Sequence, residues 1–126
     1  MTGLRVHVGD EALTAAWVEG APETRAALDA ALPLSGDAHR WGDELYVDVP
    51  VAVGPEDASA SVPVGAVAYW PAGPALCLFW GPTPASSGQE PRAASPVTLV
   101  GRLDDPDALA ALDPPGGVSV RVERRD

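Results

Sequence analysis

The chain has 126 residues, enough for one folded domain of ordinary size and too few for two. It contains no lysine, which excludes both a lysine-dependent phosphate-binding loop and Schiff-base chemistry. Its formal charge of -10 repels phosphate backbones, so nucleic acid is not an expected partner. We therefore expect residues 1–126 to form a single domain that binds no nucleic acid.

Two strands and a helix are predicted in the first part of the chain. Apolar and polar residues alternate over residues 4–8 and again over 13–17, which is typical of two strands of an antiparallel hairpin. After them, Pro22 suits the first turn of a helix, and the apolar side chains that follow share one helical face. This short helix is expected to end at Pro33.

Six further strands and a second short helix are predicted after Pro33. The strands are expected over residues 34–41, 45–49, 64–70, 75–80, 97–103 and 118–122. Asp105 is expected to cap the second helix, while residues 54–63 and 81–96 are rich in small residues and proline and are predicted to be loops. Because strands and helices do not alternate regularly, we predict a mainly β fold, a closed eight-stranded antiparallel barrel with the two helices capping its ends.

Cysteine usage and hydropathy indicate a cytoplasmic protein. Cys77 is the only cysteine, so no disulfide can form within the chain, and its apolar surroundings favour a small buried side chain. The longest apolar run, residues 75–80, is far shorter than the roughly 18 residues of a membrane span, and no signal peptide is visible. A membrane is therefore not an expected partner. The acidic, lysine-free composition favours a halophilic source.

Three segments carry a resemblance to a known family. Residues 64–84, which include the run Tyr-Trp-Pro, together with residues 95–103 and the segment Trp-Gly-Asp-Glu-Leu-Tyr at 41–46, resemble the small prokaryotic cyclophilin-like proteins. Where that family usually has an acidic residue and a second proline, this chain has Ala66 and Ala72. The resemblance implies the barrel fold of the prolyl isomerases, in a family without an assigned biochemical function.

The resemblance does not carry isomerase activity with it. Cyclophilins use an arginine and a glutamine beside a proline-sized apolar pocket, and the only glutamine here, Gln89, lies in a predicted loop. If the protein is an enzyme, we expect an isomerase-like one, with Arg40 holding the substrate carbonyl and Phe79 or Trp80 lining the pocket. The sequence favours a protein that is not an enzyme.

Aromatic residues on one predicted hairpin are the main candidates for a binding site. Alternation places Trp70 on one face of the hairpin and Tyr69 on the other, so at least one aromatic ring should lie near the surface. Packing in the core is the alternative and the commoner fate of such side chains. The candidate ligand-binding residues are Arg40, Trp41, Tyr69, Trp70, Phe79 and Trp80.

The remaining polar residues give little indication of a catalytic or metal-binding site. Arg40, Asp43 and Glu44 flank a Trp-Gly turn and could act together on a carbonyl, but charged turn residues are usually solvated. His7 and His39 lack the spacing of metal ligands, so we expect neither a metal nor another cofactor. We predict binding of an unknown peptide segment or small ligand at the aromatic surface. The alternatives are a divergent peptidyl-prolyl isomerase and a structural subunit of a homo-oligomer.

Overall fold

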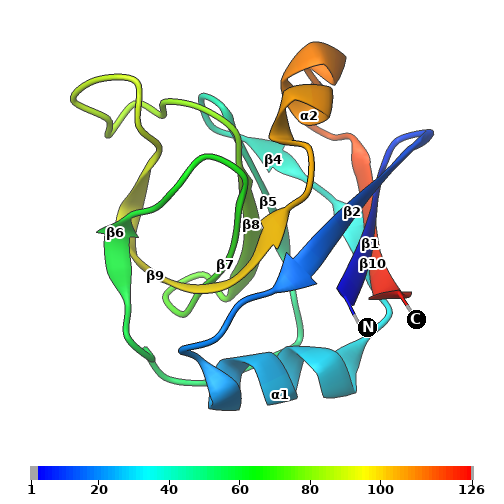
Figure 1. The fold of residues 1–126 in the computed structure, drawn as a ribbon, viewed down its shortest axis with the longest axis vertical. Helices are drawn as coiled ribbons and strands as arrows, with labels where there is room; N and C mark the ends of the chain where they lie inside the picture. Colours follow the sequence, from blue (N-terminus) through cyan, green and yellow to red (C-terminus); the bar gives the residue numbers. More distant parts are fainter. Residues whose placement is uncertain (1–2, 126) are drawn as a thin grey trace.

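The computed structural model of the protein describes residues 3–125 and contains ten strands and two helices (Figure 1). In chain order the elements are β1 Gly3–Val8, β2 Glu11–Trp17, α1 Pro22–Ala31, β3 Leu34–Asp37, β4 His39–Arg40, β5 Glu44–Asp48, β6 Ser59–Ser61, β7 Ala66–Trp70, β8 Ala75–Phe79, β9 Arg92–Leu103, α2 Pro106–Leu112 and β10 Ser119–Arg125. Neither helix of this described part is long and apolar enough to cross a membrane.

The prediction of a closed eight-stranded barrel is wrong. The strands form one ten-stranded sheet in the order β3-β10-β1-β2-β9-β7-β8-β5-β4, with β6 paired to β9 outside this path, and the sheet does not close. Its two end strands are consecutive pieces of the segment 34–40, which pairs with β10 through β3 and with β5 through β4. The two end strands β3 and β4 are not hydrogen-bonded to each other, so the sheet keeps two ends.

The two additional strands arise where the sequence predicted other structure. The predicted strand 34–41 divides at Ala38, whose amide donates to the carbonyl of Val118 and whose carbonyl accepts from the amide of Gly117. The predicted loop 54–63 contains β6. Mainly β architecture with two short helices is nevertheless confirmed.

Both helices lie where the sequence placed them, and Figure 1 shows them at opposite ends of the molecule. The predicted cap of α2 is wrong, because the Asp105 side chain makes no capping hydrogen bond. The N-terminus of α1 is capped from elsewhere in the chain. The Glu56 carboxylate accepts hydrogen bonds from the Thr24 amide at 2.8 Å and the Glu23 amide at 3.2 Å. These amide donors hold the pKa of Glu56 below its usual value.

Two apolar clusters lie on opposite faces of the β7–β8 hairpin. The inner cluster includes Val67, Tyr69, Leu76, Leu78 and Trp80, and it continues into β1, β5, β10 and α1. The smaller outer cluster contains Val62, Ala66, Ala68, Cys77, Phe79, Ala93 and Val97. The predicted alternation across the hairpin is therefore confirmed, since Tyr69 belongs to the inner cluster and Trp70 packs against the outer one.

The strand β9 covers the outer cluster. Its C-terminal half pairs with β2 and β7, whereas Val97 and Arg92 pair with the short strand β6. A register shift where β9 pairs with β7 makes a bulge, which bends the strand. Figure 1 shows β9 curving between the part that pairs with β6 and the part that pairs with β7. Gly101 lies at this bend, where a Cβ atom would be 2.9 Å from the Ala16 carbonyl oxygen. The predicted loop 81–96 is consequently wrong for residues 92–96.

The hydroxyl group of Tyr69 provides a test of this packing. It is fully buried and donates a hydrogen bond of 2.6 Å to the Val51 carbonyl, fastening the segment after β5 to the inner cluster. Replacing Tyr69 by Phe leaves that carbonyl without its donor, so we expect Tyr69→Phe to lower the free energy of unfolding by about 1–3 kcal/mol. Urea denaturation measures this change.

The control for this test is Tyr46→Phe, because Tyr46 is half-buried and its hydroxyl makes no hydrogen bond within the described residues. We expect that substitution to change stability by less than about 0.5 kcal/mol. Equal effects of the two substitutions would contradict the role of the Tyr69 hydroxyl.

Candidate functional site

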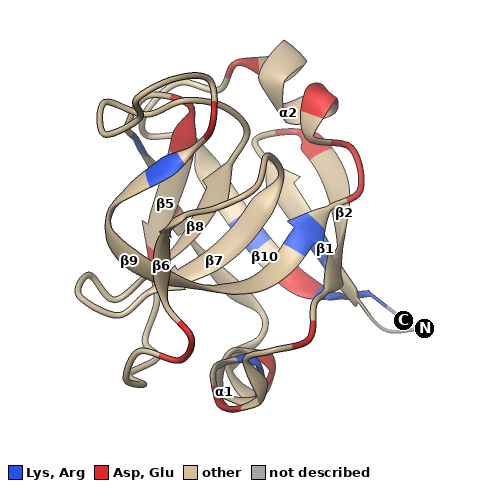
Figure 2. Ribbon diagram, turned by 60° about the vertical axis from the view of Figure 1, so that its left-hand side comes forward, with Lys and Arg blue, Asp and Glu red and all other residues tan. Residues whose placement is uncertain are grey.

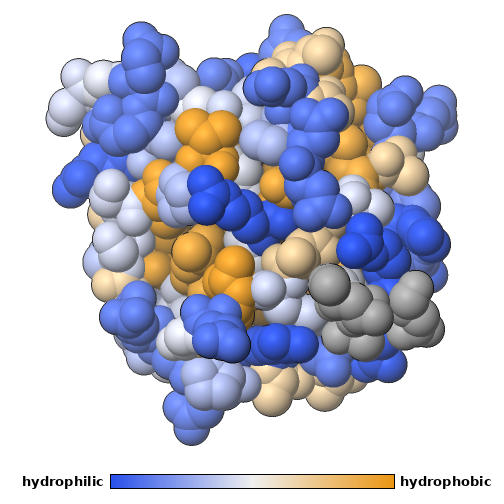
Figure 3. Space-filling view, viewed as in Figure 1, coloured by the Kyte–Doolittle hydropathy of each residue, from blue (hydrophilic) through white to orange (hydrophobic). Residues whose placement is uncertain are grey.

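A cavity of about 220 Å³ lies on the outer face of the sheet. Its lining residues come from the turn before β5, from β5 itself, from the end of β7 and from the N-terminal half of β9, and they are Trp41, Glu44, Tyr46, Trp70, Ala93, Ala94 and Val97. All three aromatic rings are half-buried, so the cavity is reached from solvent. The space-filling view in Figure 3 shows hydrophobic residues, in orange, exposed between hydrophilic ones, in blue, on one face of the molecule.

Contacts with each other and with neighbouring side chains hold the aromatic walls Tyr46 and Trp70 in place. The rings of Tyr46 and Trp70 meet edge to face with centroids 6.0 Å apart. The Trp70 indole N–H donates a hydrogen bond of 2.6 Å to the Ser95 hydroxyl, and the His39 ring stacks on Tyr46 at 5.0 Å. The two rings therefore form a prearranged surface for a ligand.

The third aromatic wall, Trp41, stands on a tight turn that the following loop supports. The Trp41 amide donates to the Glu44 carbonyl, and the Asp43 amide donates to the carbonyl of Pro82. Gly42 has a φ of 61°, and a Cβ atom there would be 2.7 Å from the Cα of Thr83. Only glycine allows the turn to approach the loop this closely.

Glu44 is the buried polar group of the cavity. Its side chain is on the outer face of β5, two pairs along the ladder from Tyr46 and Cys77, and the residue is only 5% exposed. Burial raises the pKa of Glu44 to about 7, although a hydrogen bond from the Cys77 thiol opposes the shift. No arginine or histidine of residues 3–125 lies within 4.0 Å of the Glu44 carboxyl. At neutral pH about half of the Glu44 side chains are ionised without a charged partner.

Cys77 supports Glu44 and is not a nucleophile. It is 1% exposed, which confirms the predicted burial, and burial together with the neighbouring Glu44 raises the pKa of the thiol well above its usual value. A buried, protonated thiol is chemically inert and acts here as a weak hydrogen-bond donor.

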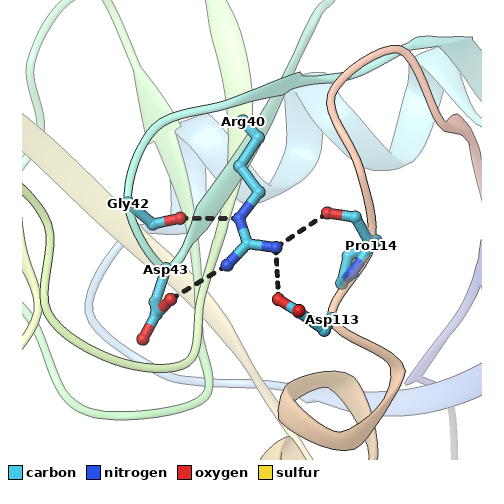
Figure 4. A network of polar contacts seen from close by, with 5 residues as sticks. All are labelled: Arg40, Gly42, Asp43, Asp113 and Pro114. Carbon is cyan, nitrogen blue, oxygen red and sulfur yellow. Dashed lines mark hydrogen bonds and ion pairs between the residues drawn. The ribbon is translucent and has the colours of Figure 1, made fainter.

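Arg40 lies near the cavity, but its guanidinium makes four hydrogen bonds elsewhere (Figure 4). Its guanidinium donates to the carbonyls of Gly42 and Pro114 at 2.8 and 2.9 Å and pairs with Asp43 and Asp113. It also stacks 5.1 Å above the centre of the Trp80 ring. These contacts connect the end of α2 to the turn before β5, and Arg40 does not line the cavity.

The structure separates the six predicted site residues. Trp41 and Trp70 line the cavity, Phe79 lies beneath it in the outer cluster, and Tyr69 and Trp80 belong to the inner cluster. The interpretation of Glu44 as a solvated turn residue is wrong, because Glu44 is the first residue of β5 and is only 5% exposed. The sequence analysis also missed Tyr46 and the part of β9 that faces it.

One signal in the sequence could have found Glu44 and Tyr46. The apolar residues Leu45, Val47 and Val49 all face the inner cluster, so the alternating Glu44 and Tyr46 must share the other face. Nothing in the pattern showed that a second layer covers that face.

The family model described as cyclophilin-like matches residues 2–123. The chain belongs to the cyclophilin-like family. It shares 37% sequence identity with a hypothetical protein of Archaeoglobus fulgidus whose solution structure superimposes with a TM-score of 0.78, over 98% of this chain and 95% of that one. The predicted family resemblance is confirmed.

A more distant structure has the same fold. The structure of McbB in complex with tryptophan matches 95% of this cyclophilin-like chain and 44% of McbB, with a TM-score of 0.71 and 15% identity. None of the curated protein sequences matches the chain.

The unpaired Glu44 carboxyl predicts a pH dependence of stability. Because its pKa is higher in the folded protein than in the unfolded chain, its contribution to stability is fully present below about pH 4.5 and is lost as the pH rises through 7. We expect Glu44→Gln to abolish a loss on the order of 2–3 kcal/mol between pH 5 and pH 8. Chemical denaturation at the two pH values measures it.

Asp48→Asn is the matched control for this experiment. Asp48 lies on the same strand and the same face as Glu44 but is exposed and does not line the cavity. This variant should keep the pH dependence of the unchanged protein. An identical pH dependence in Glu44→Gln and the unchanged protein would show that Glu44 is not buried as described.

Proposed function

We propose that this cyclophilin-like protein binds a small organic ligand in the cavity between Trp41, Tyr46 and Trp70. The observation that carries the proposal is the buried Glu44 carboxyl group, which opens onto an aromatic surface and has no charged partner among residues 3–125. Folding gains nothing from such a group, because burial of an uncompensated carboxylate opposes stability. Groups of this kind concentrate at functional sites.

The size of the cavity restricts the ligand. Its volume of about 220 Å³ is below the roughly 300–1,000 Å³ of sites for drug-sized molecules. A single ring or a short branched chain fits, whereas an extended peptide could place only one side chain there. The cavity therefore favours a small molecule over the peptide segment that the sequence analysis left open.

A screen by ligand-observed NMR tests the proposal. The compounds should be single-ring molecules and short amines, together with tryptophan, since McbB, 44% of which matches this chain, was solved in complex with tryptophan. We expect Trp70→Ala to weaken the binding of any hit at least about tenfold, because the ligand loses one wall of the cavity. Trp17→Ala is the control, since Trp17 is another half-buried tryptophan that stacks on Arg25 away from the cavity. Equal effects of the two variants would contradict the site.

The arrangement does not favour the alternative of a prolyl isomerase. Arg40 was the expected carbonyl clamp, but its guanidinium already donates to Gly42, Asp43, Asp113 and Pro114. Both expected proline-pocket residues, Phe79 and Trp80, are buried in apolar clusters. Four of the five N–H groups of Arg40 are therefore already used within the protein, and only one Nη2 N–H is left for a substrate carbonyl.

Exchange NMR on Xaa-Pro peptides separates this alternative from ligand binding. We expect the protein to leave the rate of cis-trans exchange unchanged at substoichiometric concentration. Accelerated exchange that Arg40→Lys abolishes would establish the isomerase instead. The remaining alternative, a structural subunit of a homo-oligomer, stays a prediction, as do the cytoplasmic location and the halophilic source.

A further inference from the structure

We propose that the ligand of the cavity is a compact organic cation, whose ammonium group lies beside the Glu44 carboxylate and against the rings of Trp41, Tyr46 and Trp70. This inference rests on the proposed function, because it names the chemical class that the same cavity would take. It adds that Glu44 is the specificity-determining residue.

The first argument is the missing partner of Glu44. Other partly buried acidic side chains near the site are paired, as Asp43 is with Arg40 at 3.1 Å. Glu44 receives only the weak hydrogen bond of the Cys77 thiol, although it is among the most deeply buried charged residues of the described chain. A cation in the cavity would supply the charge that the fold leaves out.

The second argument is the aromatic lining. The faces of tryptophan and tyrosine rings carry negative potential and attract cations, most strongly where water is displaced. Tyr46 and Trp70 meet edge to face, and both rings line the cavity together with Trp41. A carboxylate next to aromatic rings is therefore complementary to an ammonium group and its alkyl substituents.

The same lining argues against a metal ion as the occupant. Magnesium and calcium require several oxygen ligands, and the transition metals favour imidazole or thiolate ligands. Glu44 is the only carboxylate that lines the cavity, and the described residues contain no group of three or more side chains placed to hold a metal. The other lining residues are apolar or aromatic.

The net negative charge of the whole molecule also favours a cationic ligand. The chain has a formal charge of -10, which raises the local concentration of cations at its surface. Figure 2 shows acidic residues over many parts of the ribbon, including the start of β5, where Glu44 lies. The arginine closest in sequence to the cavity lining on β9 is Arg92, which is exposed and outside the lining.

Binding of a cation should displace the proton of Glu44. Around this carboxyl, β8 contributes Cys77 as a titratable group and otherwise Phe79, while β9 contributes apolar side chains. His39 on β4 stacks on Tyr46, and Arg40 and Asp43 in the preceding turn pair with each other. With a pKa of about 7, the ionised fraction of Glu44 rises about tenfold between pH 6 and pH 8. Cation affinity should rise by the same factor, with about 0.9 proton released to solvent for each cation bound at pH 6.

Two pairs of probes test the proposal by NMR titration at pH 6 and pH 8. Choline is compared with dimethylbutanol, in which carbon replaces the charged nitrogen, and benzylamine is compared with benzyl alcohol. We expect at least one cation to bind about tenfold more tightly than its uncharged analogue at pH 8. This preference should shrink at pH 6.

Two variants complete the experiment. Glu44→Gln keeps the shape of the side chain and removes its charge, so the cation should lose its advantage and its pH dependence. Asp48→Asn makes the same change of charge at an exposed position of the same strand and should leave both unchanged. Equal loss in both variants would mean that the field of the whole protein, and not Glu44, selects the cation, and would overturn the proposal.

The outcomes also distinguish this inference from the proposed function. If an uncharged analogue binds as tightly as its cation and Trp70→Ala weakens both, the cavity is a binding site and the inference about charge fails. If none of the four probes binds and the wider screen yields no hit that depends on Trp70, the proposed function fails together with the inference.

Discussion

The strand β9 takes part in two layers, and the cavity depends on this arrangement. Its C-terminal half is a central strand of the main sheet, between β2 and β7, while its N-terminal half pairs with β6 and crosses the outer face of the same sheet. The bulge opposite Val67 and Ala68 allows this change of direction without ending the strand. A shorter β9 would leave Cys77, Phe79 and Glu44 in contact with water, and there would be neither an outer cluster nor a closed wall beside Trp70.

Arg40 and Glu44, the charged residues on either side of the Trp41 turn, have very different surroundings. Arg40 is satisfied by two carbonyls and two carboxylates, and it connects α2 to the turn. Glu44 is buried four positions later with only a thiol as a donor, which raises its pKa to about 7 and opposes stability at neutral pH. Within the described residues, Arg40 has charged partners and Glu44 has none. This difference is consistent with a site in which a bound ligand is the charged partner of Glu44. Such a cost in stability is common where function requires it.

Local patterns in the sequence were sufficient for most elements, and long-range contacts accounted for the errors. Alternation predicted β1, β2, β5 and β10, two apolar runs on either side of a turn predicted β7 and β8, and the prolines at residues 22 and 106 marked the starts of both helices. The closed barrel was wrong because closure depends on how residues 34–40 pair with strands distant in sequence. Glu44 was misread for a related reason: a carboxylate beside a glycine turn resembles a solvated one until β9, about 50 residues further along the chain, is known to cover it. Family membership was predictable because it depends on motifs that are contiguous in the chain.

The ionisation of Glu44 is the most direct test of this account, and carbon-13 NMR of its side-chain carboxyl group measures it. The described structure predicts a midpoint near pH 7 in the free protein, which falls when choline or benzylamine is bound because a neighbouring cation favours the carboxylate. A midpoint near 4.5 in the free protein, unchanged by either cation, would show that the carboxyl is solvated and would contradict the account.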